Sequence, residues 1–304
     1  MSVAAVVVTY NRKGELLKNL CAILEQTQLV DRYYIIDNHG SDGTETALRE
    51  AGLLDNPVVE YAYLPENIGG AGGFFTGVKR AYEDGYDYVC LMDDDGRPAD
   101  NRMMERLLDA AESVSSMNPK LMLNALVLDL DGERMAFGLT GIDTKEQACA
   151  RSQDGLLRGT INPFNGTLVS RALVEAIGFP NKDFFIKGDE EDYQLRAVNS
   201  GALVATVTGS VYLHPIAEKK TVRIGKKQFS ETTEASWKEY YRARNLTYIF
   251  HREGKNGVWM RHMVRQSLLA LRYADKKIKT VYRIMKGCIH GLCGKLGKTI
   301  EPGS

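Results

Sequence analysis

The chain has 304 residues, and its 39 Lys and Arg residues balance 39 Asp and Glu residues, giving a formal net charge of +0. Hydrophobic residues make up 44% and charged residues 26%, as in soluble globular proteins, and the neutral balance argues against a nucleic-acid-binding protein. The five cysteines are odd in number and show no CxxC spacing, which argues against a disulfide framework and a structural zinc site.

The first half of the chain alternates predicted strands with predicted helices. Short apolar runs predict strands at 3–9, 33–37, 58–63 and 86–92. Helical patterns lie at 13–26 and 100–116. A third predicted helix runs to residue 51, with Ser41 or Asp42 as its N-terminal cap. A fourth follows the glycine-rich segment 66–73 and runs to residue 84. This alternation predicts a mostly parallel sheet, in which ligands bind beyond the carboxyl ends of the strands.

The second half is more mixed. We expect strands at 122–128, 134–138, 164–169, 202–207 and 211–214, and helices from Ser170, from the GDEED segment to residue 199, and at 234–251. The polar stretches 140–160 and 216–230 are expected to be mobile loops. From Trp259 onward a single long helix is expected, with apolar and basic residues interleaved. These patterns predict one domain over 1–250 and a basic helical extension over 251–304.

Three adjacent carboxylates, Asp93, Asp94 and Asp95, directly follow the strand predicted at 86–92. Carboxylates clustered in this way repel one another unless a divalent cation neutralises them, and oxygen ligands suit Mg²⁺ or Mn²⁺. Because alternate residues of an extended segment point the same way, Asp93 and Asp95 are expected to share one ion or ligand. The alternative is an acidic turn that caps the next helix, and the position at a strand end favours the site.

Two further features belong to the same predicted sheet edge. Asp37 ends the second strand, where a carboxylate can accept hydrogen bonds from a base or a ribose, or can simply form a turn. The segment ENIGGAGGF leads into a helix, and its glycines would let backbone N–H groups approach an anion; the alternative is a flexible turn. It has neither the Walker A pattern nor dinucleotide-fold spacing.

A second acidic cluster, at 189–192, opens a helix, and a later strand ends on His214. Acids in a first turn stabilise the helix dipole, but four in a row exceed what a cap requires, so one of them is a candidate general base. His214 is either structural or, beside a metal site, a neutral imidazole ligand.

Together these segments resemble the inverting family 2 glycosyltransferases, which have the GT-A fold. The resemblance runs from residue 3 to about residue 250 through VVVTYNR, IIDNHGSDGT, ENIGGAGGF, LMDDDGRP, FNGTLVSRALVEAIGFP, FFIKGDEEDYQLRA and VYLHP. It implies an α/β protein with a mixed, mainly parallel sheet flanked by helices and a C-terminal helical extension. NIGGAGGF, FIKGDEEDYQLRA and EYYRARN are similar to galactofuranosyltransferases, and polysaccharide rhamnosyltransferases share much of this pattern.

The resemblance implies transfer from a nucleotide-diphosphate sugar, with UDP-galactofuranose favoured over dTDP-rhamnose, to a hydroxyl of a cell-surface glycan or a lipid-linked saccharide. It implies Glu190 as the catalytic base, with Asp189 as the alternative. Mn²⁺ or Mg²⁺ would be held by Asp93, Asp95 and His214. The donor would be bound by Thr9, Asn11, Arg12, Asp37, Asn67, Gly69, Gly70, Gly73, Asp93 and Asp94.

Two other classes of protein are weighed against this one. A sugar nucleotidyltransferase would carry a glycine-rich triphosphate loop after its first strand, where this chain has TYNRKGE. A non-catalytic sugar-binding homologue in a polysaccharide assembly complex would not need the full set of acids and His214.

The ends of the chain bear on its location. The N-terminus lacks the features of a signal peptide, and no stretch approaches the ~20 apolar residues that cross a bilayer. We therefore expect a cytoplasmic protein. The basic tail suits peripheral contact with the anionic inner face of the cell membrane, or a helix packed on its own domain with a solvated basic face.

Overall fold

The computed structural model describes residues 1–139, 141–216, 220–224, 227–231 and 234–303. The chain forms two compact units. The first, here called the sheet unit, comprises Met1–Pro180 and Tyr193–Ile216; the second, the helical unit, comprises Asn181–Asp192 and Ala217–Ser304.

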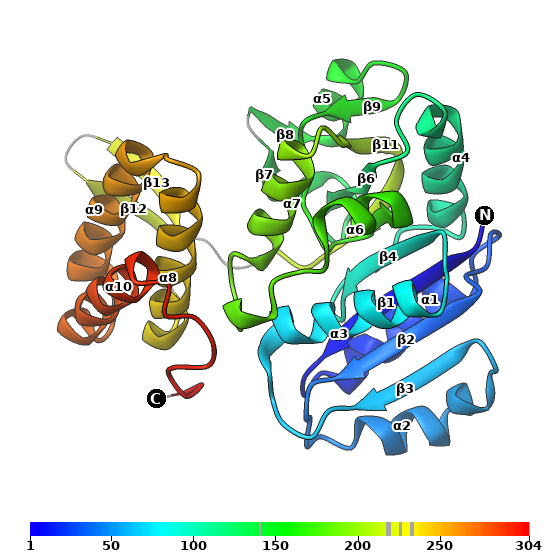
Figure 1. The fold of residues 1–304 in the computed structure, drawn as a ribbon, viewed down its shortest axis with the longest axis horizontal. Helices are drawn as coiled ribbons and strands as arrows, with labels where there is room; N and C mark the ends of the chain where they lie inside the picture. The colour runs from blue at the N-terminus through cyan, green and yellow to red at the C-terminus, as the bar shows by residue number, and fades with distance from the viewer. Residues whose placement is uncertain (140, 217–219, 225–226, 232–233, 304) are drawn as a thin grey trace. The chain divides into compact units, whose positions relative to one another are not determined.

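The first half of the sheet unit is a parallel sheet with helical connections (Figure 1). Its strands are β1 (Val3–Thr9), β2 (Arg32–Asp37), β3 (Val59–Tyr63) and β4 (Tyr88–Asp93), in the order β3-β2-β1-β4. The connections contain α1 (Lys13–Leu24), α2 (Thr44–Glu50), the short η1 (Leu53–Asp55) and α3 (Gly69–Glu83). The carboxyl ends of these strands therefore lie along one edge, as the sequence predicts.

The sheet continues from β4 through β10 (Thr167–Ser170), β6 (Leu121–Leu128) and β11 (Leu203–Leu213) to β5 (Arg97–Pro98). β10 is antiparallel to both β4 and β6, and β11 is parallel to β6. Two reversals cancel, so β6 and β11 run in the direction of β4 and end at the same edge. β7 (Arg134–Leu139) pairs with β6 and β8 (Ile142–Thr144), and β9 (Leu156–Arg158) pairs with β11. The mixed sheet flanked by helices is confirmed.

Strand β1 lies at the centre of the core and is buried on both faces. Val3, Ala5 and Val7 pack in the cluster that includes α1 and α4 (Met103–Ser115). Ala4, Val6 and Val8 pack in the opposite cluster with α3, α6 (Arg171–Ile177) and part of α7 (Asp189–Asn199). A strand covered on both faces needs no polar alternation, which is why its sequence is a continuous apolar run.

The glycine-rich segment corrects one expectation. The sequence suggested a loop over 66–73, but α3 begins at Gly69, so all the glycines of this segment are helical. A Cβ on Gly73 would overlap the Val8 side chain, and one on Gly77 would overlap Val6. These glycines let α3 lie closely on β1.

The two stretches expected to be mobile loops contain regular structure. Residues 142–158 form β8, α5 (Lys145–Arg151) and β9, and the Thr144 side chain caps α5 by accepting a hydrogen bond from the Gln147 backbone N–H. Residues 220–231 include an antiparallel pair, β12 (Lys220–Ile224) and β13 (Lys227–Glu231). Residues 140, 217–219 and 225–226 of these stretches lie outside the described residues. The polar composition of these stretches concealed short helices and strands.

Smaller corrections concern element ends. The strands expected at 202–207 and 211–214 are one strand, β11, whose pairing with β6 shifts register between Val207 and Val211. β10 begins only at Thr167, because Phe164 and Gly166 have positive φ. Helix α2 is preceded by Gly43 in the left-handed conformation without a side-chain cap, whereas Ser41 or Asp42 was expected. The Asp42 carboxylate instead accepts hydrogen bonds from the Lys13 backbone N–H and the Thr44 hydroxyl.

The helical unit contains α8 (Ser236–Arg252), α9 (Asn256–Tyr273) and α10 (Lys277–Leu292), so the single long helix expected after Trp259 is two helices. Gly287 and Gly291 of α10 lie against the backbone carbonyls of Tyr240 and Arg244 in α8. A boundary near residue 250 was expected, but this close packing places α8 with α9 and α10. Within the described residues, no helix has both the length and the apolar character needed to cross a membrane.

The α3–β1 contact yields a stability prediction. Gly77→Ala should lower the free energy of unfolding by about 1–3 kcal/mol, because the added methyl overpacks against Val6. Gly70→Ala is the matched control: nothing lies within 4 Å of its Cβ position, so alanine should be neutral or stabilising there. Urea denaturation of both variants tests this. Equal stability of the two would contradict the proposed close approach.

Candidate functional site

The carboxyl edge of the sheet gathers the polar residues that end its strands. Thr9 pairs in register with Asp37 of β2, and Val8 pairs with Asp93 of β4. His214 directly follows β11, and its backbone N–H donates to the Leu128 carbonyl at the end of β6. Segments distant in the sequence thus bring acids and an imidazole to one place.

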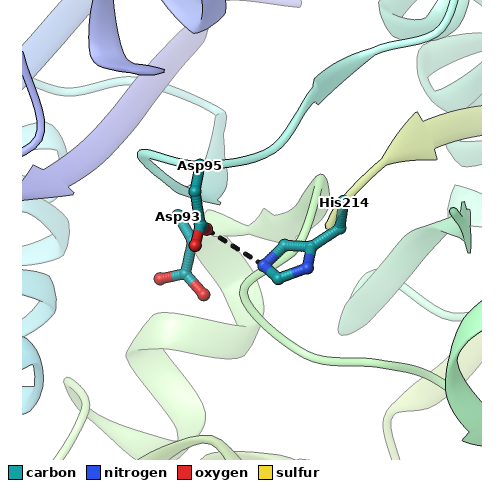
Figure 2. Close-up of side chains that lie close together, drawn as sticks. All are labelled: Asp93, Asp95 and His214. Atoms are coloured by element: carbon teal, nitrogen blue, oxygen red, sulfur yellow. Dashed lines mark ion pairs between the residues drawn. The ribbon is translucent and has the colours of Figure 1, made fainter. Parts of the chain in front are cut away.

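Asp93, Asp95 and His214 form a cluster whose potential ligand atoms all lie within 4.8 Å of one another. Figure 2 shows the Asp93 carboxylate at the end of β4, the Asp95 carboxylate on the turn that follows, and the imidazole approaching from the end of β11. His214 Nε2 lies 3.0 Å from Asp95 Oδ1. Its Nδ1 lies 2.8 Å from the Pro215 carbonyl, to which an Nδ1–H donates, and this leaves Nε2 directed at the carboxylates. Two carboxylates and one imidazole are a donor set that fits Mn²⁺ or Mg²⁺.

The electrostatics of this turn favour a cation. Burial, reinforced by the charge of Asp95, raises the pKa of Asp93 to about 7. Burial also raises the pKa of Asp94 to about 6, against the opposing effect of Arg12. Burial acts to raise the pKa of Asp95 as well, but the hydrogen bond from His214 outweighs it and the pKa is lowered. A group of crowded carboxylates in this state is stabilised by added positive charge.

Asp94 is bound to the first loop of the sheet rather than to the cluster. The Thr9 hydroxyl donates to Asp94 Oδ2 at 2.8 Å, and Arg12 Nη1 donates to Asp94 Oδ1 at 3.2 Å. The same guanidinium pairs with Asp95, and its side chain remains 52% exposed. Burial lowers the pKa of Arg12, but Asp95 and Asp94 outweigh that effect and raise it. Arg12 is therefore a half-exposed cation at the edge of the acidic cluster.

A buried polar network, which was not predicted from the sequence, holds the backbone of the turn that carries the acids. The Tyr212 hydroxyl donates to the Asp93 carbonyl at 3.0 Å, and Asn19 Nδ2 donates to the Gly96 carbonyl at 2.7 Å. Gly96 is required here because a Cβ would overlap the Tyr212 ring. The one available signal was Asn19, a polar residue on the otherwise apolar face of α1.

Asp37 is 1% exposed, and both of its oxygens have protein donors. Oδ1 accepts from the Gly40 backbone N–H and Oδ2 from the Tyr61 hydroxyl, each at 2.7 Å. Asn11, which has a φ of 55°, accepts a hydrogen bond from the Ser41 backbone N–H through Oδ1. The Asn11–Ser41 bond fastens the loop after β1 to the loop after β2, whereas the Tyr61 bond joins Asp37 to β3.

The start of α3 is organised by two asparagines. Asn67 Oδ1 accepts from the Gly69 backbone N–H at 2.9 Å and from Asn38 Nδ2 at 3.1 Å. Asn38 Oδ1 in turn accepts from the Ile68 backbone N–H. Gly69 and Gly70 therefore lie at the helix N-terminus, whereas Gly73 lies one turn further on against β1. Asn38 was not among the site residues predicted from the sequence.

The candidate bases lie on the first turn of α7, in the helical unit, whereas the acids of β4 and His214 belong to the sheet unit. Asp189 is buried and Glu190 is half-buried. Lys187 Nζ pairs with Glu234 Oε1 at 2.8 Å. Burial lowers the pKa of Lys187, but the charges of Glu234 and Glu190 outweigh that effect and raise it, so Glu190 lies close to a cation.

Comparison with known proteins identifies the family. A model described as glycosyl transferase family 2 matches residues 4–116. The galactofuranosyltransferase GlfT1 of Mycobacterium tuberculosis is 34% identical over 262 residues, which cover 83% of this chain and 83% of that protein. The chain belongs to the family 2 glycosyltransferases. This glycosyltransferase is also 24% identical to the dTDP-rhamnosyl transferase RfbF of Shigella flexneri, over 92% of this chain and 89% of that one.

Solved structures show the fold. Residues 1–349 of TarS from S. aureus, in complex with UDP, superpose with a TM-score of 0.56 at 12% identity, covering 97% of this glycosyltransferase and 83% of that chain. The mannosyltransferase PcManGT from Pyrobaculum calidifontis, in complex with GDP-Man and Mn²⁺, has a TM-score of 0.55 at 15% identity. The match covers 96% of this glycosyltransferase and 87% of that chain. The predicted family and the predicted GT-A fold are confirmed.

The cluster predicts divalent-metal binding that depends on its side chains. Asp95→Asn and His214→Ala should each weaken the affinity for Mn²⁺ at least tenfold, since even the partners of metal ligands commonly contribute 10–100-fold. Electron paramagnetic resonance titration of free Mn²⁺ measures this. Asp131→Asn, which removes an exposed acid from the turn after β6, should bind like the wild type. Equal affinity of all the variants would show that the ion binds elsewhere.

Proposed function

We propose that this glycosyltransferase transfers galactofuranose from UDP-galactofuranose to a saccharide hydroxyl, with inversion at the anomeric carbon. The observation that carries the choice of sugar is the 34% identity to a galactofuranosyltransferase over 83% of the chain. The proposed acceptor is a cell-surface glycan or a lipid-linked saccharide.

Mn²⁺ or Mg²⁺ is the proposed cofactor, with Asp93, Asp95 and His214 as its ligands. Support comes from the donor set and from two structural neighbours that were solved with Mn²⁺, PcManGT and GalNAc-T7, the latter with a TM-score of 0.59 at 12% identity. A bound ion would supply positive charge to the diphosphate of the donor.

The remaining donor contacts follow from the edge of the sheet. The guanidinium of Arg12 is half-exposed and can pair with a phosphate once a cation shares the charge of Asp94 and Asp95. Asn67, Gly69 and Gly70 form the N-terminus of α3, a helix of 15 residues, where backbone N–H groups favour anions. Asp37, with Thr9 and Asn11 nearby along the strand ends, is proposed to bind the nucleoside. Gly73 is proposed to act through the packing of α3.

The proposed reaction is a single displacement. Glu190 removes the proton from the acceptor hydroxyl, and the oxygen attacks the anomeric carbon on the face opposite the leaving nucleoside diphosphate. A new glycosidic bond forms as the bond to the diphosphate breaks, so the configuration inverts. The Lys187 ammonium, paired with Glu234, lies beside Glu190. Asp189, which is buried, is the alternative base.

The alternative donor is dTDP-rhamnose. The likeness to a dTDP-rhamnosyl transferase extends over 92% of the chain, although at 24% identity. The two donors differ in both base and sugar, so binding measurements distinguish them.

The donor and the base are tested together. Calorimetry with Mn²⁺ present should show UDP binding more tightly than dTDP or GDP, and removal of the metal should weaken it. Glu190→Gln should keep UDP affinity but lower kcat for transfer from UDP-galactofuranose by about 10²–10⁴-fold, the usual contribution of a general base.

The donor sugar, the catalytic base and the presence of activity are each tested by a different outcome of these measurements. A preference for dTDP would replace galactofuranose with rhamnose. Normal transfer by Glu190→Gln together with loss of transfer in Asp189→Asn would make Asp189 the base. Absence of nucleoside diphosphate release with either donor would favour the non-catalytic homologue.

We also propose that α9 and α10 bind an anionic membrane surface. Their outward stripes recur at three- and four-residue steps and are 46–85% exposed: Met260, Val264, Leu268, Leu271, Ile278, Tyr282, Met285, Ile289 and Leu292. The opposite faces are packed through buried residues such as Met263, Ala270, Ile284 and Gly287. Over 256–292 the chain has eight Lys and Arg residues against the single acid Asp275. Exposed apolar stripes flanked by basic residues fit anionic lipid.

Vesicle flotation tests the surface. The full chain should float with vesicles that contain phosphatidylglycerol, less so at high salt, and the double variant Ile278→Glu with Ile289→Glu should stay in the soluble fraction. Met117→Glu is the control, since Met117 is 73% exposed but lies in the sheet unit. Equal flotation of both variants, or none by the wild type, would overturn the proposal; a concentration-dependent dimer lost in the double variant would assign the stripes to self-association.

A further inference from the structure

Arg244 of α8 is a fully buried cation that donates hydrogen bonds to two segments outside its helix, residues 183–184 and residues 297–299. Its side chain is among the largest that are wholly buried. Nη2 donates to the carbonyls of Asp183 and Phe184, at 3.2 and 2.8 Å, and Nε donates to Asn245 Oδ1 at 2.8 Å. The guanidinium carbon lies 4.8 Å from the centre of the Tyr241 ring. Burial lowers the pKa of Arg244, so this charge is kept at a cost that only well-formed hydrogen bonds offset.

Asn245, the next residue, acts on the same segment. Its Nδ2 donates to the carbonyls of Phe184, Ile186 and Lys187, at 3.0, 3.0 and 2.6 Å. A Cβ placed on Gly188 would lie 3.1 Å from the Asn245 Cβ, so the segment also packs closely on this side chain. Two consecutive residues of α8 thus hold carbonyls of residues 183–187.

The held segment has a strained backbone and leads directly into the proposed base. Phe185 and Lys187 have φ values of 65° and 66°, which side-chain-bearing residues rarely adopt, and Gly188 follows with 89°. Asp189 and Glu190 come next, on the first turn of α7. Such conformations persist only where the surroundings enforce them.

The C-terminal residues 297–300 complete the arrangement. The Gly297 backbone N–H donates to the Asp183 carbonyl at 2.6 Å, and Arg244 Nη1 donates to the Gly297 carbonyl. The Tyr241 hydroxyl accepts from the backbone N–H groups of Thr299 and Ile300 and donates to the Ile300 carbonyl. We propose that Arg244 and Asn245, braced by residues 297–300 through Tyr241, are positioning residues that fix the 183–188 segment and thereby aim Glu190 at the acceptor. The inference rests on the proposed function, in which Glu190 is the base.

Kinetics of Asn245→Ala and Tyr241→Phe test this. Asn245→Ala should lower kcat by about 100-fold, the effect that a misplacement of about 1 Å can have, while the UDP affinity and the KM for the donor change less than about twofold. Tyr241→Phe keeps the aromatic ring and removes only the bonds to residues 299–300, so a smaller loss of kcat is expected. Both variants should show faster amide hydrogen exchange across residues 183–190.

Thr247→Val is the matched control. Thr247 is buried on the same helix, and its hydroxyl accepts a hydrogen bond from Trp259 Nε1 without touching the 183–188 segment. It should lower Tm without changing kcat or exchange across residues 183–190. Parallel losses of kcat and Tm in Thr247→Val and Asn245→Ala would show a purely structural role and overturn the inference.

Hydrogen exchange separates this inference from the function on which it rests. Unchanged exchange across residues 183–190 in Asn245→Ala would overturn the positioning role whatever the kinetics. Normal transfer by Glu190→Gln would instead refute the assignment of the base, and faster exchange in Asn245→Ala would still show that Asn245 holds the segment.

Discussion

The repulsion among three crowded carboxylates, Asp93, Asp94 and Asp95, is the constraint on which the ligand edge of the sheet unit depends. Asp94 is compensated by Arg12 and Thr9, and Asp95 by His214 and Arg12. Within the described residues, the Asp93 carboxylate accepts no hydrogen bond, and its pKa is raised to about 7 by burial and by Asp95. The protein thus satisfies two acids internally, and the third is the one that the proposed cation would neutralise.

Holding that cluster together requires a rigid support rather than a flexible loop. Tyr212 reaches the Asp93 carbonyl from β11, Asn19 reaches the Gly96 carbonyl from α1, and Tyr33 of β2 donates to Asn19. Buried polar groups are costly unless each finds a partner, and here they satisfy one another across three elements. The network fixes the turn after β4, and the same strand, β11, then delivers His214 to the cluster.

Much of this could be anticipated from the sequence, because buried parallel strands are continuous apolar runs and their acidic ends mark the ligand edge. What could not be anticipated depends on contacts between distant residues. Asn19 and Tyr212 are 193 positions apart, and no local pattern pairs them. Glycines have two uses that composition does not separate: Gly70 lies open at a helix start, whereas Gly73 lets α3 approach β1. Likewise, residues 142–158 pack through too few apolar side chains to produce a clear hydrophobic periodicity in the sequence.

The larger revision concerns the C-terminal part, which the sequence presented as an appendage beyond residue 250. In the structure α8 and the residues after α10 hold the backbone that precedes Glu190, while α7 itself belongs to both units, with Asp192 paired to Arg252 and Tyr193 buried in the sheet unit. A base on a surface loop would be free to move, since loops carry few constraints. Here the strain at Phe185 and Lys187 is opposed by Arg244 and Asn245, so the proposed base and the proposed membrane-binding helices are parts of one packed unit.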